Sequence, residues 1–314
     1  MSDRTATSGL ERQRRLLKAL SRCRTTNSAG GLLAHLLRWT RRRALLARLD
    51  GEWQAGFVLH ETGDLVFVPT PLDARGRHCL LNPPRAHKAA LAVLGPGAVA
   101  LDIGASLGEW AVPLARAVGP TGRLVAFEPQ ALIARALEAT LRINNLAQAS
   151  MVEAAVSDRV GAQNLTVPEI TSSAVDTGRA RLGAAGAGET ASTVRSVTLD
   201  GFIGAAGLDR LDLVKIDVEG HERAVLDGAR ATIARFHPAI VLETGHENAA
   251  DRAAIAALLR GADYALIGVL LDHGVAPASW ESYASGATPC LPGEVHNLLI
   301  LPAAAVHPAS RDDG

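Results

Sequence analysis

The densest group of polar side chains in the sequence is the run at 215–222, which reads Lys-Ile-Asp-Val-Glu-Gly-His-Glu. The run follows the largely apolar segment 211–214, so we expect it to emerge from the end of a buried strand. Side chains alternate along a strand, which places Lys215, Asp217 and Glu219 on the same side. Burying three charged groups together is costly unless they serve a ligand or one another. We therefore interpret the run as a candidate catalytic site, with an ion-paired structural network as the alternative.

Two further groups extend this candidate site. His221 carries an imidazole that titrates near neutral pH and could serve as a base, although histidines near a helix start are often structural. The apolar run 239–242 ends in Glu243, which adds another carboxylate at the same edge.

A glycine-containing turn follows the apolar segment 99–103. Gly104 and Gly108 let the backbone turn sharply and approach a ligand closely, and the helix expected after them begins with free N–H groups. The spacing is not GxGxxG, so the turn alone is weak evidence for a cofactor. Glu128 ends the second expected strand, 20 residues beyond Gly108, where a carboxylate can accept both ribose hydroxyls of a nucleoside cofactor.

The third expected strand ends in Ala-Ala-Val-Ser-Asp at 154–158. Asp158, beside the apolar Val156, lies where a carboxylate could meet the amino group of an adenine. The alternative is a turn aspartate that caps the next segment.

The elements that must position these residues alternate between strand and helix. Strands are expected at 99–103, 124–127, 150–156, 211–216, 239–243, 264–270 and 294–301, and helices at 110–118, 132–144, 221–235 and 249–260. This order predicts an α/β fold with a mostly parallel sheet and helices on both faces. Ligands of such sheets bind at the carboxyl ends of the strands, which is where the polar groups above are expected.

The rest of the chain divides around this region. We expect a basic, partly helical N-terminal extension at 1–50, with the helix at 32–49, and a hairpin (53–68) and a helix (85–94) within 51–95. The cofactor-binding domain then spans 96–302, and a tail follows at 303–314. The Gly- and Ala-rich insertion 161–195 shows no periodicity and predicts a long loop, either a functional lid or a disordered segment.

Charge and composition limit the partners. Residues 1–50 contain twelve basic and three acidic residues, a net charge of +9 in a chain whose total is zero. The extension is therefore suited to docking on the main domain, or to contact with an anionic surface or partner; no motif supports specific nucleic-acid binding. No signal peptide or membrane-spanning segment is expected, and three dispersed cysteines disfavour a disulfide scaffold and a cysteine-based zinc site. The expected location is the cytoplasm, and an oligomer is compatible with the sequence.

Taken together, the motifs resemble the FkbM-type family of class I S-adenosylmethionine-dependent methyltransferases. The matching segments lie at 102–109 (Asp-Ile-Gly-Ala-Ser-Leu-Gly-Glu), 127–129 (Phe-Glu-Pro), 155–158 (Ala-Val-Ser-Asp), 172–173 (Ser-Ser), 197–200 (Val-Thr-Leu-Asp), 213–222 (Leu-Val-Lys-Ile-Asp-Val-Glu-Gly-His-Glu), 240–243 (Ile-Val-Leu-Glu) and 297–302 (Asn-Leu-Leu-Ile-Leu-Pro). Two positions depart from the family's pattern: Ser106 stands where Asn is usual, and His221 where Ala is more frequent.

The resemblance implies a Rossmann-like sheet of seven strands with the last one antiparallel, and S-adenosylmethionine as the cofactor. It implies that Asp102, Gly104 and Glu109 surround the amino-acid part of the cofactor, that Glu128 holds the ribose, and that Asp158 lies near the adenine. The complete set of candidate cofactor-binding residues is Asp102, Gly104, Ala105, Ser106, Gly108, Glu109, Glu128, Pro129, Val156, Ser157, Asp158 and Asp217.

Methyl transfer to a hydroxyl of a sugar, polyketide or other natural product is the expected reaction. Asp217 or His221 would take the proton, while Lys215, Glu219 and Glu243 would position the small-molecule or glycan acceptor. Carboxylates also suit Mg²⁺, but the sequence has no fixed ligand spacing for it. The alternatives are N-methyl or carboxyl methyl transfer, a nicotinamide-dependent oxidoreductase and a non-catalytic binding protein.

Overall fold

The computed structural model describes residues 56–59, 64–69, 88–171, 174–175, 177–186, 189–271, 274–288 and 296–306. The expected extension at 1–50, including its helix, and the Ser-Ser pair at 172–173 lie outside these residues. Of the expected tail, the described part is the short helix α12 (Ala303–Val306).

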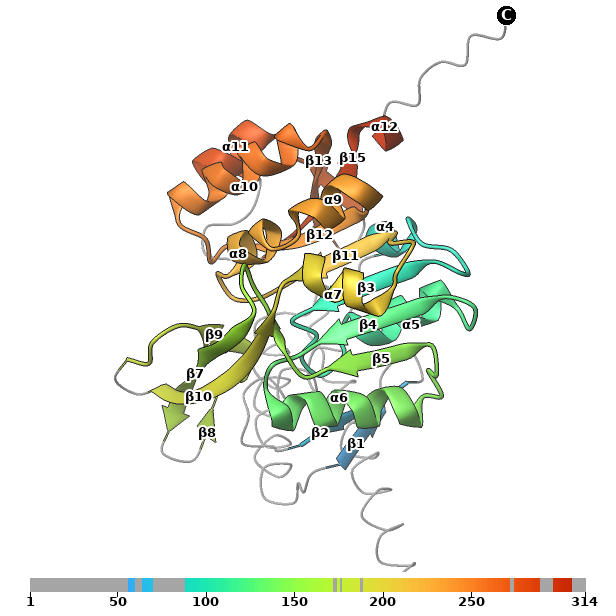
Figure 1. The fold of residues 1–314 in the computed structure, drawn as a ribbon, viewed down its shortest axis with the longest axis vertical. Coiled ribbons are helices and arrows are strands. Elements are labelled where there is room, and N and C mark those ends of the chain that lie inside the picture. Colours follow the sequence, from blue (N-terminus) through green and yellow to red (C-terminus); the bar gives the residue numbers. More distant parts are fainter. Residues whose placement is uncertain are drawn as a thin grey trace, which may run out of the picture.

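The centre of the molecule is an eight-stranded sheet in the order β14-β13-β15-β12-β11-β3-β4-β5 (Figure 1). Five adjacent strands run parallel, and β15 lies antiparallel to β12 and β13. This arrangement confirms the α/β fold class. The short strand β14 adds one edge strand to the seven that the resemblance implies. The bounds are β3 (Val99–Ile103), β4 (Arg123–Phe127), β5 (Ala149–Val152), β11 (Leu213–Ile216), β12 (Ala239–Thr244), β13 (Tyr264–Leu271), β14 (Gly274–Pro277) and β15 (His296–Pro302).

Helices cover both faces of this sheet because its strands carry apolar side chains on both sides. Leu101 and Ile103 of β3 belong to one core, whereas Ala100, which precedes Leu101, belongs to the other. The first core is closed by α7 (Leu199–Ala206), α8 (Glu222–Asp227), α9 (Arg230–Phe236), α10 (Ala249–Gly261) and α11 (Trp280–Ser285). The second is closed by α4 (Lys88–Leu91), α5 (Ala111–Val118) and α6 (Ala131–Ile143).

The expected hairpin before the core is present as β1 (Gly56–Leu59) and β2 (Leu65–Val68), paired antiparallel. Strand β2 lies against α6, where the backbone N–H groups of Leu65 and Phe67 donate to the side chains of Asn144 and Thr140 at 2.9 Å each. The hairpin is thus fixed to the outer side of the helix that follows β4.

Two elements differ from the sequence-based expectation. The strand expected at 150–156 is divided into β5 and β6 (Ala155–Val156), because the chain turns at Ala154, whose N–H donates to Val152 O. The helix expected at 221–235 is divided into α8 and α9. At the break, a Cβ on Gly228 would lie 2.1 Å from the carbonyl oxygen of Ser157, so only glycine fits there.

The Thr-Leu-Asp block at 198–200 has a structural role that the sequence did not reveal. The Thr198 side chain caps α7 by accepting from Gly201 N at 3.1 Å. Asp200 accepts hydrogen bonds from the backbone N–H groups of Ala231 and Thr232, at 3.1 and 2.7 Å. The block therefore joins α7 to the start of α9.

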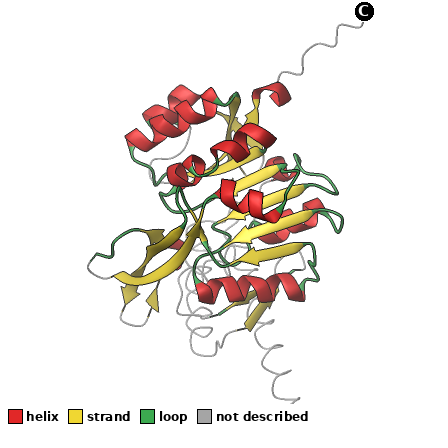
Figure 2. Ribbon diagram, in the orientation of Figure 1, coloured by secondary structure: helices red, strands yellow, loops and turns green. Residues whose placement is uncertain are grey.

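The insertion between β6 and α7 is a small antiparallel sheet, so the expectation of a structureless loop was wrong. It contains β7 (Gly161–Thr171), β8 (Ala174–Val175), a 3₁₀ turn (Thr177–Arg179), β9 (Arg181–Leu182) and β10 (Glu189–Val197). We refer to residues 161–197 as the arm. The arm stands beyond the carboxyl ends of β4 and β5, and Figure 2 shows it as strands and loops (Figures 1 and 2).

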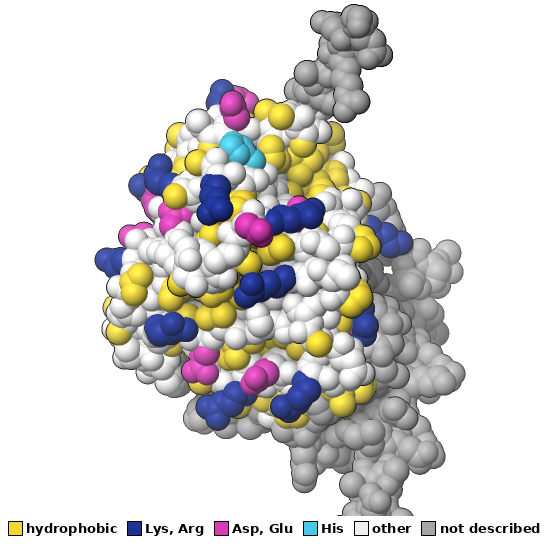
Figure 3. Space-filling model, turned by 45° about the vertical axis from the view of Figure 1, so that its right-hand side comes forward, with side chains coloured by type: hydrophobic (Ala, Val, Ile, Leu, Met, Phe, Trp, Pro, Cys, Tyr) yellow, Lys and Arg dark blue, Asp and Glu magenta, His cyan; other side chains and the backbone are white. Residues whose placement is uncertain are grey.

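The surface of the described residues carries charged side chains of both signs. On the face seen in Figure 3, basic and acidic side chains of the described residues are interspersed rather than gathered by sign.

In the described parts of the chain, no helix has both the length and the apolarity that crossing a bilayer requires.

Candidate active site

A cleft opens where the carboxyl ends of β3, β4, β11 and β12 face the arm. It encloses about 710 Å³, part of it at the open mouth. The sheet side contributes backbone turns and carboxylates, and the arm contributes small and apolar residues. The lining residues are Ile103, Gly104, Ser106, Phe127, Glu128, Pro129, Gln130, Ala154, Ala155, Val156, Leu165, Gly178, Ala180, Leu182, Asp217, Val218, Glu219, His221 and Glu243.

The turn after β3 brings backbone to the cleft wall. Gly104 has a φ of +79°, and a Cβ there would lie 1.8 Å from the carbonyl oxygen of Asp217. Any side chain at this position would push β3 and β11 apart. The next polar residue, Ser106, also adopts a left-handed φ of 48° and lines the cleft.

Glu128 is the buried carboxylate of this turn. It accepts hydrogen bonds from the backbone N–H groups of Ser106, at 3.0 Å, and of Gln130, at 2.9 Å. Burial raises the pKa of Glu128 to about 7, although these two hydrogen bonds oppose the rise. The carboxylate is thus fixed in place, with further acceptor capacity toward the cleft.

Lys215 and Asp217 form a buried ion pair behind the cleft wall. Lys215 Nζ lies 2.9 Å from Asp217 Oδ2 and 5.4 Å from the ring centre of Trp110. The Lys215 side chain is fully buried, whereas that of Asp217 is 21% exposed. Burial alone would lower the pKa of Lys215, but the carboxylates of Asp217, Glu243 and Asp102 outweigh it and raise the pKa.

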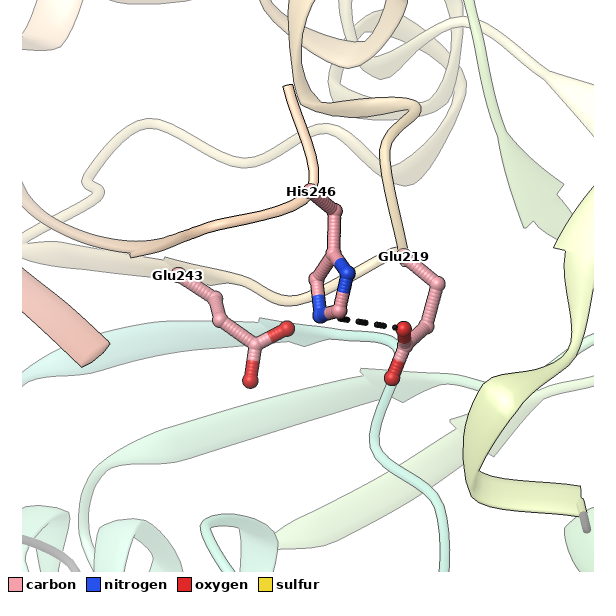
Figure 4. Close-up of side chains that lie close together, drawn as sticks. All are labelled: Glu219, Glu243 and His246. Carbon is pink, nitrogen blue, oxygen red and sulfur yellow. Dashed lines mark ion pairs between the residues drawn. The ribbon is translucent and has the colours of Figure 1, made fainter. Parts of the chain in front are cut away.

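Three carboxylates, Asp217, Glu219 and Glu243, form what we call the carboxylate rim. Burial, followed by the proximity of Asp217, raises the pKa of Glu243 to about 11. Glu219 forms an ion pair with His246 in the loop after β12, with 3.2 Å between Oε2 and Nε2 (Figure 4). Acidic groups therefore converge at one end of the cleft.

His221 lines the cleft but is already engaged. Its Nε2 lies 2.9 Å from the hydroxyl of Ser157, which also donates to Asp158 at 3.0 Å. Burial is the main cause that lowers the pKa of His221. At neutral pH the ring is therefore uncharged, and its Nε2 is occupied by Ser157.

Residues 102–266 match the family model of the methyltransferase FkbM domain, which is more than half of the chain. The chain belongs to the FkbM methyltransferase family. It is therefore an S-adenosylmethionine-dependent methyltransferase, and the nicotinamide-dependent and non-catalytic alternatives are not supported. The search of curated proteins returned no match.

Solved structures with similarity to this methyltransferase include several methyltransferases. One is methyltransferase FkbM from Methylobacillus flagellatus, with 14% identity, a TM-score of 0.38 and coverage of 71% of this chain and 52% of that one. A second is precorrin-6y C5,15-methyltransferase from Geobacter metallireducens, with 13% identity, a TM-score of 0.38 and coverage of 68% and 86%. A third is a SAM-dependent methyltransferase from Aquifex aeolicus, with 12% identity, a TM-score of 0.36 and coverage of 73% and 94%.

The residues present fit S-adenosylmethionine. The turn at Gly104 lines the cleft, and Glu128 is a preorganised hydrogen-bond acceptor beside it. Asp102, at the end of β3, is buried, and among the described residues its Oδ2 has no hydrogen-bond partner. Burial raises the pKa of Asp102 to about 7, against the effect of Lys215. These features suit a ligand that carries hydroxyl and amino donors.

The structure brings only part of the predicted site to the cleft wall of the methyltransferase. On the wall are Gly104, Ser106, Glu128, Pro129, Val156, Asp217, Glu219, His221 and Glu243. The other predicted residues lie off it: Asp102, Ala105, Gly108, Glu109, Ser157, Asp158 and Lys215. Lys215 lies behind Asp217, so it affects the cleft through its ion pair with Asp217. Asp158 forms an ion pair with Arg159, whose Nε lies 3.3 Å from Asp158 Oδ1.

Other lining residues were not singled out from the sequence. Gln130 follows Glu128 by two residues and immediately precedes α6. The expected start of a helix at this point is the sequence feature that could have identified Gln130 as a lining residue. Leu165, Ala180 and Leu182 come from the arm, which was expected to be either a functional lid or a disordered segment, without assigned residues. His246 was not assigned a role from the sequence.

Proposed function

We propose that this methyltransferase acts on a hydroxyl group of a small-molecule acceptor, such as a sugar, a polyketide or another natural product. S-adenosylmethionine supplies an activated methyl group when bound, so the protein must mainly align the acceptor and remove its proton. The observation that best supports the proposal is the position of Asp217, which lies on the cleft wall with Lys215 bound behind it. A carboxylate fixed in this way is suited to accept a hydroxyl proton.

Asp217 is favoured over His221 as the general base. The Nε2 atom of His221 is occupied by Ser157, whereas the Asp217 side chain keeps exposure to the cleft. Glu219 and Glu243 flank Asp217 on the same wall and are placed to orient the acceptor.

The opposite wall indicates the rest of the acceptor. Leu165, Ala180 and Leu182 of the arm present small and apolar surface across from the carboxylate rim. This pairing suits an acceptor that has a hydroxyl at one end and an apolar portion at the other.

The test is the variant Asp217→Asn, assayed with labelled S-adenosylmethionine on a panel of hydroxyl, amine and carboxylate acceptors. We expect turnover to fall by about 10²-fold or more, the usual contribution of a general base, while binding of S-adenosylhomocysteine persists. The substitution leaves Lys215 without its carboxylate partner, so the fold of the variant must be checked. Retained binding of S-adenosylhomocysteine shows that the variant is folded. Glu153→Gln, on the exposed surface outside the cleft, is the control. Unchanged turnover would remove Asp217 as the base, and methylation of amines or carboxylates alone would overturn the hydroxyl proposal.

A further inference from the structure

Three side chains of the types that bind metal ions meet at one end of the cleft. Glu219 follows β11, Glu243 lies near the end of β12, and His246 is in the loop after β12. One ligand atom from each residue lies within 4.8 Å of the others. Figure 4 shows the Glu243 carboxylate and the Glu219 carboxylate on either side of the His246 ring. Ligand atoms around a bound transition-metal ion are about 3–3.5 Å apart, given bonds of about 2.0–2.2 Å, so small side-chain movements would complete the geometry.

A second observation points to a ligand at this position. The Oε2 atom of Glu243 is shielded from solvent and has no hydrogen-bond partner among the residues that the structure describes. Buried carboxylate oxygens without a partner are uncommon in folded proteins and call for an explanation. A cation bound between Glu243 and His246 would provide the missing partner.

The local charge also favours a cation. Asp217, Glu219 and Glu243 stand close together, and Lys215 is committed to Asp217 at 2.9 Å. Acidic groups gathered in a poorly solvated site interact favourably with a cation. A divalent ion would balance the charges of Glu219 and Glu243 while His246 binds as the neutral imidazole.

We propose that Glu219, Glu243 and His246 form a binding site for a divalent transition-metal ion, of the Mn²⁺ or Zn²⁺ type, at the carboxylate-rim end of the cleft. Two oxygen ligands and one imidazole nitrogen suit such ions better than Mg²⁺, which prefers oxygen and retains its waters. Three protein ligands leave coordination positions open, as in catalytic metal sites. Glu219 and Glu243 both line the cleft, so these positions face the space for the acceptor.

Metal binding at this site does not depend on the identity of the acceptor. The role of the ion in methyl transfer rests on the proposed function. If the proposed function holds, an acceptor oxygen can occupy an open position on the ion beside Asp217, which orients the hydroxyl for proton removal.

The experiment measures metal binding directly on the untagged, EDTA-stripped full chain. Mn²⁺, Zn²⁺ and Mg²⁺ are titrated by calorimetry and equilibrium dialysis, and bound Mn²⁺ is examined by electron-spin-echo spectroscopy for coupling to an imidazole nitrogen. We expect one Mn²⁺ or Zn²⁺ per chain, bound at least tenfold more tightly than Mg²⁺, and a nitrogen signal that is lost in His246→Ala.

Matched variants locate the site. Glu219→Gln, Glu243→Gln and His246→Ala should each weaken Mn²⁺ binding at least tenfold, whereas Glu153→Gln on the exposed surface should leave it unchanged. Binding of S-adenosylhomocysteine by every variant verifies the fold. The absence of Mn²⁺ and Zn²⁺ binding by the unmodified chain, or equal affinity in the rim variants and the control, would overturn the proposal. Metal binding without methylation of any hydroxyl acceptor would reject the proposed function alone.

Discussion

Glu128 is held by two backbone N–H groups, and its buried carboxylate lines the cleft where we expect the cofactor to bind. Hydrogen bonds to a charged group contribute about 1.5–3 kcal/mol. We therefore expect Glu128→Ala to weaken binding of S-adenosylhomocysteine by about 10- to 100-fold, measured by calorimetry. Glu153→Ala, outside the cleft, should bind as the unmodified chain does. Equal affinities for the two variants would show that Glu128 does not contact the cofactor.

Glu222 gives the protein a pH-dependent stability. Its side chain is buried, with Oε1 accepting from Gly220 N and with Oε2 lacking a hydrogen-bond partner in the described part of the chain. Burial raises the pKa of Glu222 from 4.5 to about 7; its backbone hydrogen bonds oppose this rise, and the nearby Glu247 and Asp217 add to it. The folded state therefore holds the Glu222 proton more tightly than the unfolded state does.

The sign of the effect follows from this difference. The stabilisation from Glu222 is fully present below pH 4.5 and is lost as the pH rises through about 7. Glu222→Gln removes the titration, so its melting temperature relative to the unmodified chain should increase between pH 5 and pH 8. Thermal unfolding at several pH values measures this, with exposed Glu153→Gln as the control. A constant difference across the range would contradict the prediction.

At the scale of elements, the break between α8 and α9 depends on one glycine. Gly228 approaches the carbonyl of Ser157 so closely that a Cβ would lie 2.1 Å from the oxygen. Gly228→Ala should lower the free energy of unfolding by about 2 kcal/mol or more, because backbone must move to relieve the clash. Gly204→Ala is the matched control, since a Cβ there meets nothing within 4 Å in the exposed part of α7. The control should be stabilised by about 0.5–1 kcal/mol, and chemical denaturation distinguishes the two.

The arm is expected to affect the acceptor and not the cofactor. Leu182 of β9 lines the cleft, and Arg181 beside it is bound by Glu189 at 2.8 and 3.0 Å. Leu182→Ala removes apolar surface from the acceptor side, worth about 1–2 kcal/mol if an acceptor covers it. The KM for the acceptor should rise about 5- to 30-fold, while the affinity for S-adenosylhomocysteine changes less than twofold. Leu132→Ala, exposed on α6, is the control. A shift in cofactor affinity instead would place the arm over the cofactor.

At the scale of the whole molecule, the sequence predicted the elements that are buried on both faces. Strands β3, β11 and β12 are short apolar runs, and their polar ends identify the edge of the sheet where the cleft lies. The arm could not be recognised in the same way, because most residues of β10 are exposed or half-buried and give no apolar alternation.

The parts of the site that the sequence did not predict are explained by the same lack of periodicity. Strand alternation places Lys215 and Asp217 together, but the strand ends at Ile216, and Glu219 adopts a left-handed φ of 51° beyond it. The position of Glu219 beside His246 therefore depends on two loops that no periodicity describes. Likewise, Asp158 lies off the cleft although Val156, two residues before it, lines the cleft, and the sequence does not indicate this change.

The arm leaves the core after β6 and returns beside it, since Ser196 and Val197 of β10 pair with Ala155 and Val156. Departure and return at neighbouring points make the arm an insertion that can be exchanged as one block, because the core sheet and its register need not change. If the arm contacts the acceptor as proposed, we expect a variant with a different segment at this insertion to retain its cofactor and to change its acceptor. Under the proposed function, the fold thus places acceptor choice in a segment that can change without altering the cofactor-binding core.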